Sequence, residues 1–109
     1  MPNDELVILL RRGAGAWNSW RAGRDDTPDL SQASLRGLDL SGFDLSRADV
    51  RGADLRGAYL RLAKLDGADL SDANLEGVEG LTQTQLDRAQ LNSGTQLPEG
   101  LIGAEDAER

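Results

Sequence analysis

The sequence predicts a solenoid of stacked units, because one stretch of the chain repeats every five residues. Branched apolar residues keep this spacing at Leu30, Leu35, Leu40, Leu45, Val50, Leu55, Leu60, Leu65, Leu70 and Leu75. A second set lies two residues before each of them from Leu35 on, and it is Ala33, Leu38, Phe43, Ala48, Ala53, Ala58, Ala63, Ala68 and Ala73. Neither a helix, with about 3.6 residues per turn, nor a flat strand would keep both sets on one side. A fixed internal repeat of this kind indicates stacked units.

The successive segments ADVRG, ADLRG, AYLRL, AKLDG, ADLSD and ANLEG resemble the pentapeptide-repeat family, whose consensus is A-(D/N)-L-X-X. The resemblance covers residues 28–77, about half of the chain. It implies an all-β solenoid, a right-handed quadrilateral β-helix in which each unit forms one side and four units form a coil. About 2.5–3 coils are then expected. The central residue and the small residue two positions before it would point inward.

We expect one domain over residues 1–109, with an N-terminal α-helical cap before the repeat. Residues 3–24 are predicted to form this helix, on which Leu6, Leu10, Trp17 and Trp20 make one apolar face. This face would cover the open first coil. The alternative is a free amphipathic helix for a membrane or a partner, but the balance of charges gives only a weak membrane signal.

The five-residue spacing fails after position 77, where we expect a short helical and extended C-terminal cap over residues 78–101. The segment Thr82–Gln85 matches the capping box S/T-x-x-E/Q, which predicts a helix over about residues 83–89. Two further units centred on Leu86 and Leu91 are the alternative. Residues 102–109 are charged and small, and we expect them to be frayed.

Outward residues should stack at twenty-residue intervals, because four units complete a coil. This spacing aligns Asp29 with Asp49 and Asp69, Ser34 with Asp54 and Asn74, Asp39 with Tyr59, and Asp44 with Lys64. We expect the carboxylates to accept turn hydrogen bonds from nearby backbone N–H groups; a cation site is the alternative. Arg56 is expected to pair with Glu76, and an anion site at Arg36 and Arg56 is a further alternative.

The composition argues against several classes of function. The chain has 19 acidic and 12 basic residues and a net charge of −7, which disfavours direct binding to nucleic acid. It contains no cysteine and no histidine, and we find no nucleophile–base pair, phosphate loop or zinc pattern. We therefore expect no enzymatic activity, no cofactor and no metal, and a soluble cytoplasmic protein with no membrane association.

Two functions remain: a non-catalytic structural or protein-interaction module, and a DNA mimic that inhibits DNA gyrase, as the resemblance allows. The repeat carries a smaller excess of acids than a duplex of its height, so we favour the first. The candidate interaction face carries Asp39, Tyr59, Arg61 and Leu62, because Tyr59 and Leu62 place large side chains outward. The alternative is that the N-terminal helix or the C-terminal tail covers this patch. We expect a monomer or a weak homodimer.

Overall fold

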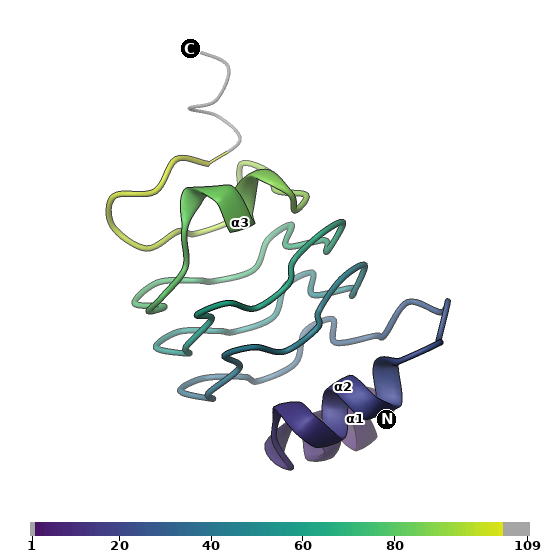
Figure 1. The fold of residues 1–109 in the computed structure, drawn as a ribbon. Coiled ribbons are helices and arrows are strands. Elements are labelled where there is room, and N and C mark those ends of the chain that lie inside the picture. Colours follow the sequence, from purple (N-terminus) through teal and green to yellow (C-terminus); the bar gives the residue numbers. More distant parts are fainter. Residues whose placement is uncertain (1, 104–109) are drawn as a thin grey trace.

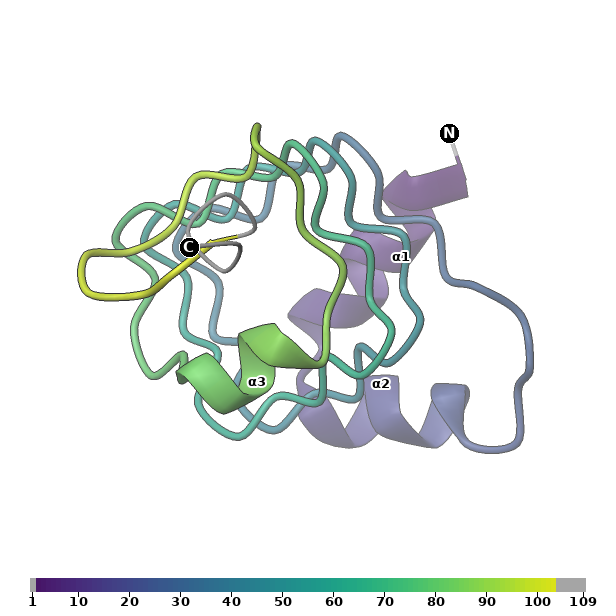
Figure 2. The ribbon, with the colours of Figure 1, turned by 90° about the horizontal axis from the view of Figure 1, so that it is seen from above.

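The structure is a computed structural model that describes residues 2–103 of the chain, and the side chains of residues 4–103. Helices α1 (Pro2–Arg11) and α2 (Ala14–Arg21) lie at one end, and α3 (Gln83–Asp87) lies towards the other end (Figure 1). Between them the five-residue repeat winds into turns that are stacked along one axis. Seen along this axis, the turns follow one another in register around a common interior (Figure 2).

Parallel β-bridges join the stacked turns at the spacing that the sequence predicts. The bridged columns are Asp29–Asp49–Asp69, Ser34–Asp54–Asn74, Asp39–Tyr59–Glu79 and Asp44–Lys64. The hydrogen bonds of each column run both ways between neighbouring turns. The N–H of Leu30 donates to the carbonyl oxygen of Asp49 at 2.8 Å, and the N–H of Asp49 donates to the carbonyl oxygen of Pro28 at 2.8 Å. The backbone groups of one turn are therefore satisfied by the next.

Each five-residue unit changes direction at a tight turn with a left-handed residue. In the first unit, the N–H of Ala33 donates to the carbonyl oxygen of Leu30 at 3.2 Å, and Gln32 between them has a φ of 59°. A type II turn requires this positive φ at its third residue, which favours glycine. Glycine fills the position at 37, 42, 52, 57, 67 and 77, and the exceptions are Gln32, Arg47, Leu62 and Asp72.

The interior of the stack is a narrow column of aliphatic side chains. All ten central residues from Leu30 to Leu75 are at most 3% exposed. The alanines of the second set are also buried, because only a small side chain fits beside each central residue. Leu38 differs from the rest of this set, since it is only half-buried. The core is therefore tight along its length and opens at the unit that contains Leu38.

The N-terminal segment forms two helices, so the prediction of one helix over residues 3–24 is wrong. α1 ends at Arg11, and α2 begins at Ala14 and ends at Arg21. Gly13 lies between them with a φ of 105°, which residues with a side chain rarely adopt. This break lets the two helices lie at an angle to each other against the first turn (Figure 2). No helix in the described part of the chain has the length and the apolar character needed to span a bilayer.

The predicted apolar face of the N-terminal segment packs against the first turn. Leu10 and Trp17 are buried in the common core, and Leu6 and Trp20 are partly buried against it. The Trp17 ring lies 6.4 Å from that of Phe43, centroid to centroid. Phe43 occupies a position that is alanine in most units, and it fits because the helices, and not another turn, lie below it.

The C-terminal segment forms the predicted helix and then rejoins the stack. α3 has the predicted capping box and ends at Asp87, two residues earlier than expected. It takes the place of the fourth side of the third turn (Figure 2). Bridges resume at Gln90 with Asp69 and at Gln96 with Asn74. The alternative of two regular units is not observed, because Leu86 lies in α3, but the ladder continues well past residue 77.

The start of the expected frayed tail is held in place. The backbone N–H of Ile102 donates to Oε1 of Gln83 at 2.9 Å, and Nε2 of Gln83 donates to the carbonyl oxygen of Ile102 at 3.1 Å. Residues 104–109, the remainder of that tail, lie outside the described residues.

Candidate protein-interaction face

The candidate face lies on the side of the stack that is formed by the column Asp39–Tyr59–Glu79, which we call the Tyr59 side. Tyr59 is 44% exposed and Leu62 is 76% exposed. Neither the N-terminal helices nor the C-terminal segment up to residue 103 covers the Leu62 side chain. For the described residues, this excludes the alternative that another part of the chain covers the patch.

Leu62 reaches solvent because it occupies the left-handed turn position of its unit. Its φ is 62°, and a residue with a side chain pays about 1–2 kcal/mol for this conformation relative to the right-handed one. The exposed side chain gains little burial to offset this cost. The arrangement is therefore unfavourable for stability alone.

A shallow hollow of about 390 Å³ lies beside Leu62. Its lining residues are Arg61, Leu62, Ala63, Gly80, Thr82 and Gln85. The hollow exists because position 80, where the spacing calls for a central leucine, is a glycine packed against the turn below. A Cβ at Gly80 would lie 2.8 Å from the Cβ of Arg61, so no side chain can fill this position. The break in the five-residue spacing is visible in the sequence. The hollow itself could not be predicted, because it also depends on the position of α3, which contributes Gln85 and its N-cap residue Thr82 to the lining.

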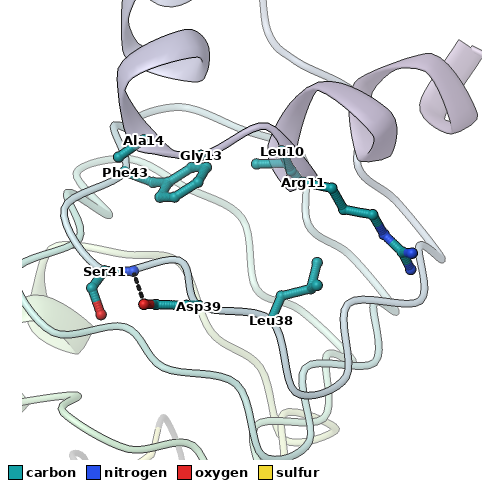
Figure 3. A pocket seen from close by; sticks show the side chains of 8 residues that line it. All are labelled: Leu10, Arg11, Gly13, Ala14, Leu38, Asp39, Ser41 and Phe43. Atoms are coloured by element: carbon teal, nitrogen blue, oxygen red, sulfur yellow. Dashed lines mark hydrogen bonds between the residues drawn. The ribbon is translucent and has the colours of Figure 1, made fainter.

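Asp39, the fourth residue of the candidate face, belongs to a different feature of the Tyr59 side. It lines a second hollow, of about 370 Å³, between the first turn and the N-terminal helices (Figure 3). Its carboxylate accepts a hydrogen bond from the N–H of Ser41 at 3.0 Å. Hydrogen bonding from Ser41 lowers the pKa of Asp39 below its ordinary value. The structure therefore places Tyr59, Arg61 and Leu62 on one patch, next to the hollow beside Leu62. Asp39 lies one turn lower and lines the other hollow.

The acidic columns make the turn hydrogen bonds that the sequence predicts. Carboxylate oxygens accept the N–H of the residue two positions later at 3.0–3.2 Å in the units of Asp29, Asp39, Asp44, Asp49, Asp54 and Asp69. Asn74 makes the same bond through its amide oxygen. Within residues 4–103, no group of three acidic side chains is placed to hold a metal ion.

Two of these carboxylates also bind arginines of their own units. Arg51 reaches Asp49 and Arg56 reaches Asp54, each through two hydrogen bonds of 2.8 and 2.9 Å. The predicted pairing of Arg56 with Glu76 is therefore replaced by one within the unit, because the side chain folds back along its own strand. Arg36 lies 3.8 Å from Asp54 and adds a weaker contact. Both candidate anion-binding arginines thus face a carboxylate.

We expect the unfolding of the protein to depend on pH through Asp54. The hydrogen bond from the Arg56 guanidinium is the main cause that lowers the pKa of Asp54 from 3.8 to about 2. A lowered carboxyl pKa stabilises the fold above the unfolded-state value, and this stabilisation is lost as the pH falls from about 4 to about 2. Arg56→Gln should raise the pKa of Asp54 in a carbon-13 NMR titration, and Arg36→Gln should raise it less. An unchanged pKa in Arg56→Gln would contradict the assignment.

Two residues that the sequence pattern did not predict hold α2 against the first turn. Arg21 is only 4% exposed, and its Nη2 donates to the carbonyl oxygen of Ser46 at 2.7 Å. Nδ2 of Asn18 donates to the carbonyl oxygen of Gly42 at 3.0 Å. A signal existed for Arg21, because it follows Trp17 by four residues and so shares its helix face.

Two further side chains that were missed act in the same way at the C-terminal end. Nε2 of Gln85 donates to the carbonyl oxygens of Leu60 and Ala63 at 2.8 and 2.9 Å. The hydroxyl of Thr95 donates to the carbonyl oxygen of Leu70 at 2.9 Å. Only the capping box of Gln85 could be predicted from the sequence. The Ala63 carbonyl is available because no regular unit follows above it, whereas the Leu60 and Leu70 carbonyls also accept the turn N–H groups of Ala63 and Ala73.

Known protein families and solved structures include chains with the same five-residue repeat. The sequence model described as "Pentapeptide repeats" matches 8 copies, over residues 29–61 and 44–79. None of the curated proteins matches the chain. A pentapeptide repeat protein (Rfr23) from the cyanobacterium Cyanothece 51142 is 22% identical, with 69% of this chain and 67% of that chain covered and a TM-score of 0.43.

A second solved structure, the pentapeptide repeat protein alr5209 from Nostoc Pcc 7120, is 33% identical. The comparison covers 78% of this chain and 84% of that chain, with a TM-score of 0.36. Pentapeptide-repeat proteins form β-helices, the fold class that the resemblance implies. From the matched repeats and the stacked columns, the chain belongs to the pentapeptide-repeat family.

Proposed function

We propose that the protein is a non-catalytic protein-interaction module, a right-handed four-sided β-helix closed by helical caps at both ends. It binds another protein, needs no cofactor, and is itself a monomer or a weak homodimer. The observation that carries the proposal is the exposed Leu62 side chain, held in a left-handed conformation in the unit of Tyr59 and beside a shallow hollow. Backbone strain of this kind is a guide to function where packing does not explain it.

The chemistry of the patch supports a protein partner. Tyr59, Arg61 and Leu62 combine an aromatic ring, a guanidinium and an aliphatic side chain, and aromatic and arginine residues are enriched where binding energy concentrates in interfaces. The hollow beside Leu62 offers room for an inserted side chain of the partner. The rigid ladder beneath holds these groups in place, so little conformational entropy is lost on binding.

The DNA-mimic alternative has weaker support. A mimic must present an uncompensated row of negative charges comparable to the phosphates of a duplex. Asp49 and Asp54 are instead bound bidentately by Arg51 and Arg56, which cancels charge on two sides of the stack. Inhibition of gyrase supercoiling by micromolar protein would reverse this ranking.

The interaction face can be tested with the double variant Tyr59→Ser and Leu62→Gly. We expect its melting temperature to stay the same or rise slightly, because glycine relieves the left-handed strain and both side chains are exposed. Capture of the partner from the native cell extract should be abolished, and the affinity of the purified partner for the variant should fall at least about tenfold, or 1.4 kcal/mol.

Arg47→Gly is the matched control, because Arg47 occupies the same left-handed turn position with a φ of 60° on another corner. This control should bind the partner as the unmodified protein does. A loss of several kcal/mol in the stability of the double variant would show that the patch is internal packing, and the interaction proposal should then be abandoned.

A further inference from the structure

The lower edge of the first turn is closed on one side by side chains of α2. On the Asp44 side, the backbone groups that a preceding turn would pair are bound by helix residues instead. The carbonyl oxygen of Asp44 accepts Nε1–H of Trp17 at 2.8 Å, and the N–H of Asp44 donates to Oδ1 of Asn18 at 2.8 Å. The Ser46 carbonyl is taken by Arg21. Helix α2 therefore replaces a missing strand on this side.

The neighbouring Tyr59 side has no such replacement. One turn higher, its ladder is complete: Leu40 N–H donates to the Tyr59 oxygen at 2.8 Å, and Tyr59 N–H donates to the Leu38 oxygen at 2.9 Å. The equivalent groups of the first turn are the N–H of Asp39 and the carbonyl oxygens of Asp39 and Ser41. Within residues 2–103, these three groups have no hydrogen-bond partner. They form a short open strand edge.

A hollow of about 370 Å³ with a mixed lining, which includes Arg11, lies directly against this edge (Figure 3). Leu38 and Phe43 line it from the first turn, and Leu10 and Ala14 line it from the helices. Leu38 is the half-buried exception among the inward-facing positions, so this edge has an apolar wall that no described residue fully covers. The hollow is at the lower end of the range of ligand pockets, about 300–1,000 Å³.

The break between α1 and α2 leaves this space open. Gly13 lines the hollow, and a Cβ built on it would meet no atom within 4 Å. A continuous helix over the predicted range would not bend away at this point. The hollow is therefore bounded on one side by a strand edge and on the other by the bend of the N-terminal segment.

We propose that this edge accepts an extended segment of a partner protein, which adds as a parallel strand beneath Asp39–Ser41. The segment donates two N–H groups to the carbonyl oxygens of Asp39 and Ser41, and one of its carbonyls accepts the N–H of Asp39. It places one small aliphatic side chain, two positions before its central residue, beneath Leu38. The occupant is defined by these groups, because unpaired ladder positions select an extended backbone and an apolar wall selects an aliphatic side chain. The site is separate from the Leu62 patch and does not depend on it.

The probe is the peptide acetyl-Ala-Asp-Leu-Ser-Gly amide, added to nitrogen-15-labelled full-length protein. In the ladder of this structure, the central residue and the residue two later donate upward, so the leucine N–H should bind Asp39 and the glycine N–H should bind Ser41. We expect saturable shifts of the backbone amides of residues 38–42 at millimolar peptide. Hydrogen exchange of the Asp39 amide, fast in the free protein, should slow at least about tenfold.

The matched control is the same peptide with a methyl group on the leucine nitrogen, which removes one donor and should abolish the shifts. In the protein, Asp39→Pro removes the edge N–H and should abolish binding, whereas Asp39→Asn keeps the N–H and the turn bond and should retain it. The Tyr59→Ser and Leu62→Gly double variant should bind the peptide normally, which separates this site from the proposed interaction face.

Several results would overturn the proposal. These are the absence of saturable shifts at residues 38–42, equal shifts with the methylated peptide, or an Asp39 amide that is already protected in the free protein. If dilution of the protein alone moves the same amides, the occupant is a second copy of this chain and the proposed partner strand is wrong. If Asp39→Pro fails to fold, the two peptides still decide the outcome.

Discussion

Replacing Ala58 with phenylalanine should lower the free energy of unfolding by about 3 kcal/mol or more, at the upper end of what overpacking costs. Ala58 is fully buried in the second turn, with the first turn below it and the third above it. The backbone ladder fixes the spacing of the turns, so the interior cannot widen to accept a ring. Chemical denaturation monitored by circular dichroism measures the change.

Phe43 and Arg61 provide the comparison for this variant. Phe43 shows that a ring is accepted at the same position of a neighbouring unit in the first turn, where Trp17 and not another turn lies below it. Arg61→Phe places the same ring outward from the unit of Ala58 and should change stability by less than about 0.5 kcal/mol. A wild-type melting temperature for Ala58→Phe would refute the tight interior.

Deleting residues 1–24 should cause aggregation and loss of the cooperative melting transition. The deletion uncovers Phe43 and the first turn, and it removes the side chains that bind the carbonyls of Asp44 and Ser46. An uncovered strand edge with adjacent apolar surface promotes association between chains. Analytical ultracentrifugation and thermal melting measure the two effects.

Trp17→Ala tests the same contact if the deleted chain cannot be purified. Trp17 is fully buried, and its removal should cost about 3–5 kcal/mol. Ile8→Ser is the control, because Ile8 is exposed on α1 and its replacement should leave stability nearly unchanged. If the deleted protein stays monomeric with unchanged melting, the N-terminal helices do not close the stack.

The sequence was informative wherever one periodic rule governed the structure. The five-residue spacing predicted the buried column from Leu30 to Leu75, and the twenty-residue spacing predicted which outward residues pair across turns. Departures from the rule were also informative, since Tyr59 and Leu62 are both exposed. The capping box located α3 because it is a local signal of a few residues.

Prediction failed where the outcome depended on a choice between partners or on a changed spacing. Arg56 could reach Asp54 or Glu76, and only the side-chain conformation decides between them. After α3, the β-bridges resume between Asp69 and Gln90 and between Asn74 and Gln96. These two intervals differ from the twenty residues of the repeat and from each other, because α3 and the loop after it interrupt the repeat. The hollow at Asp39 requires the relative placement of α1, α2 and the first turn, which the residue pattern does not contain.

The twenty-residue register has a consequence for how a chain of this kind can change in length. The α2 contacts are made with the Asp44 side of the first turn, and the α3 contacts are made with Leu60 and Ala63 of the turn that α3 covers. Inserting whole sets of four units between them would keep both ends facing the same sides. Inserting one, two or three units would rotate one end by a quarter, a half or three quarters of a revolution and misalign it. The length of the stack can therefore change only by whole turns of four units, each of which adds about 4.8 Å.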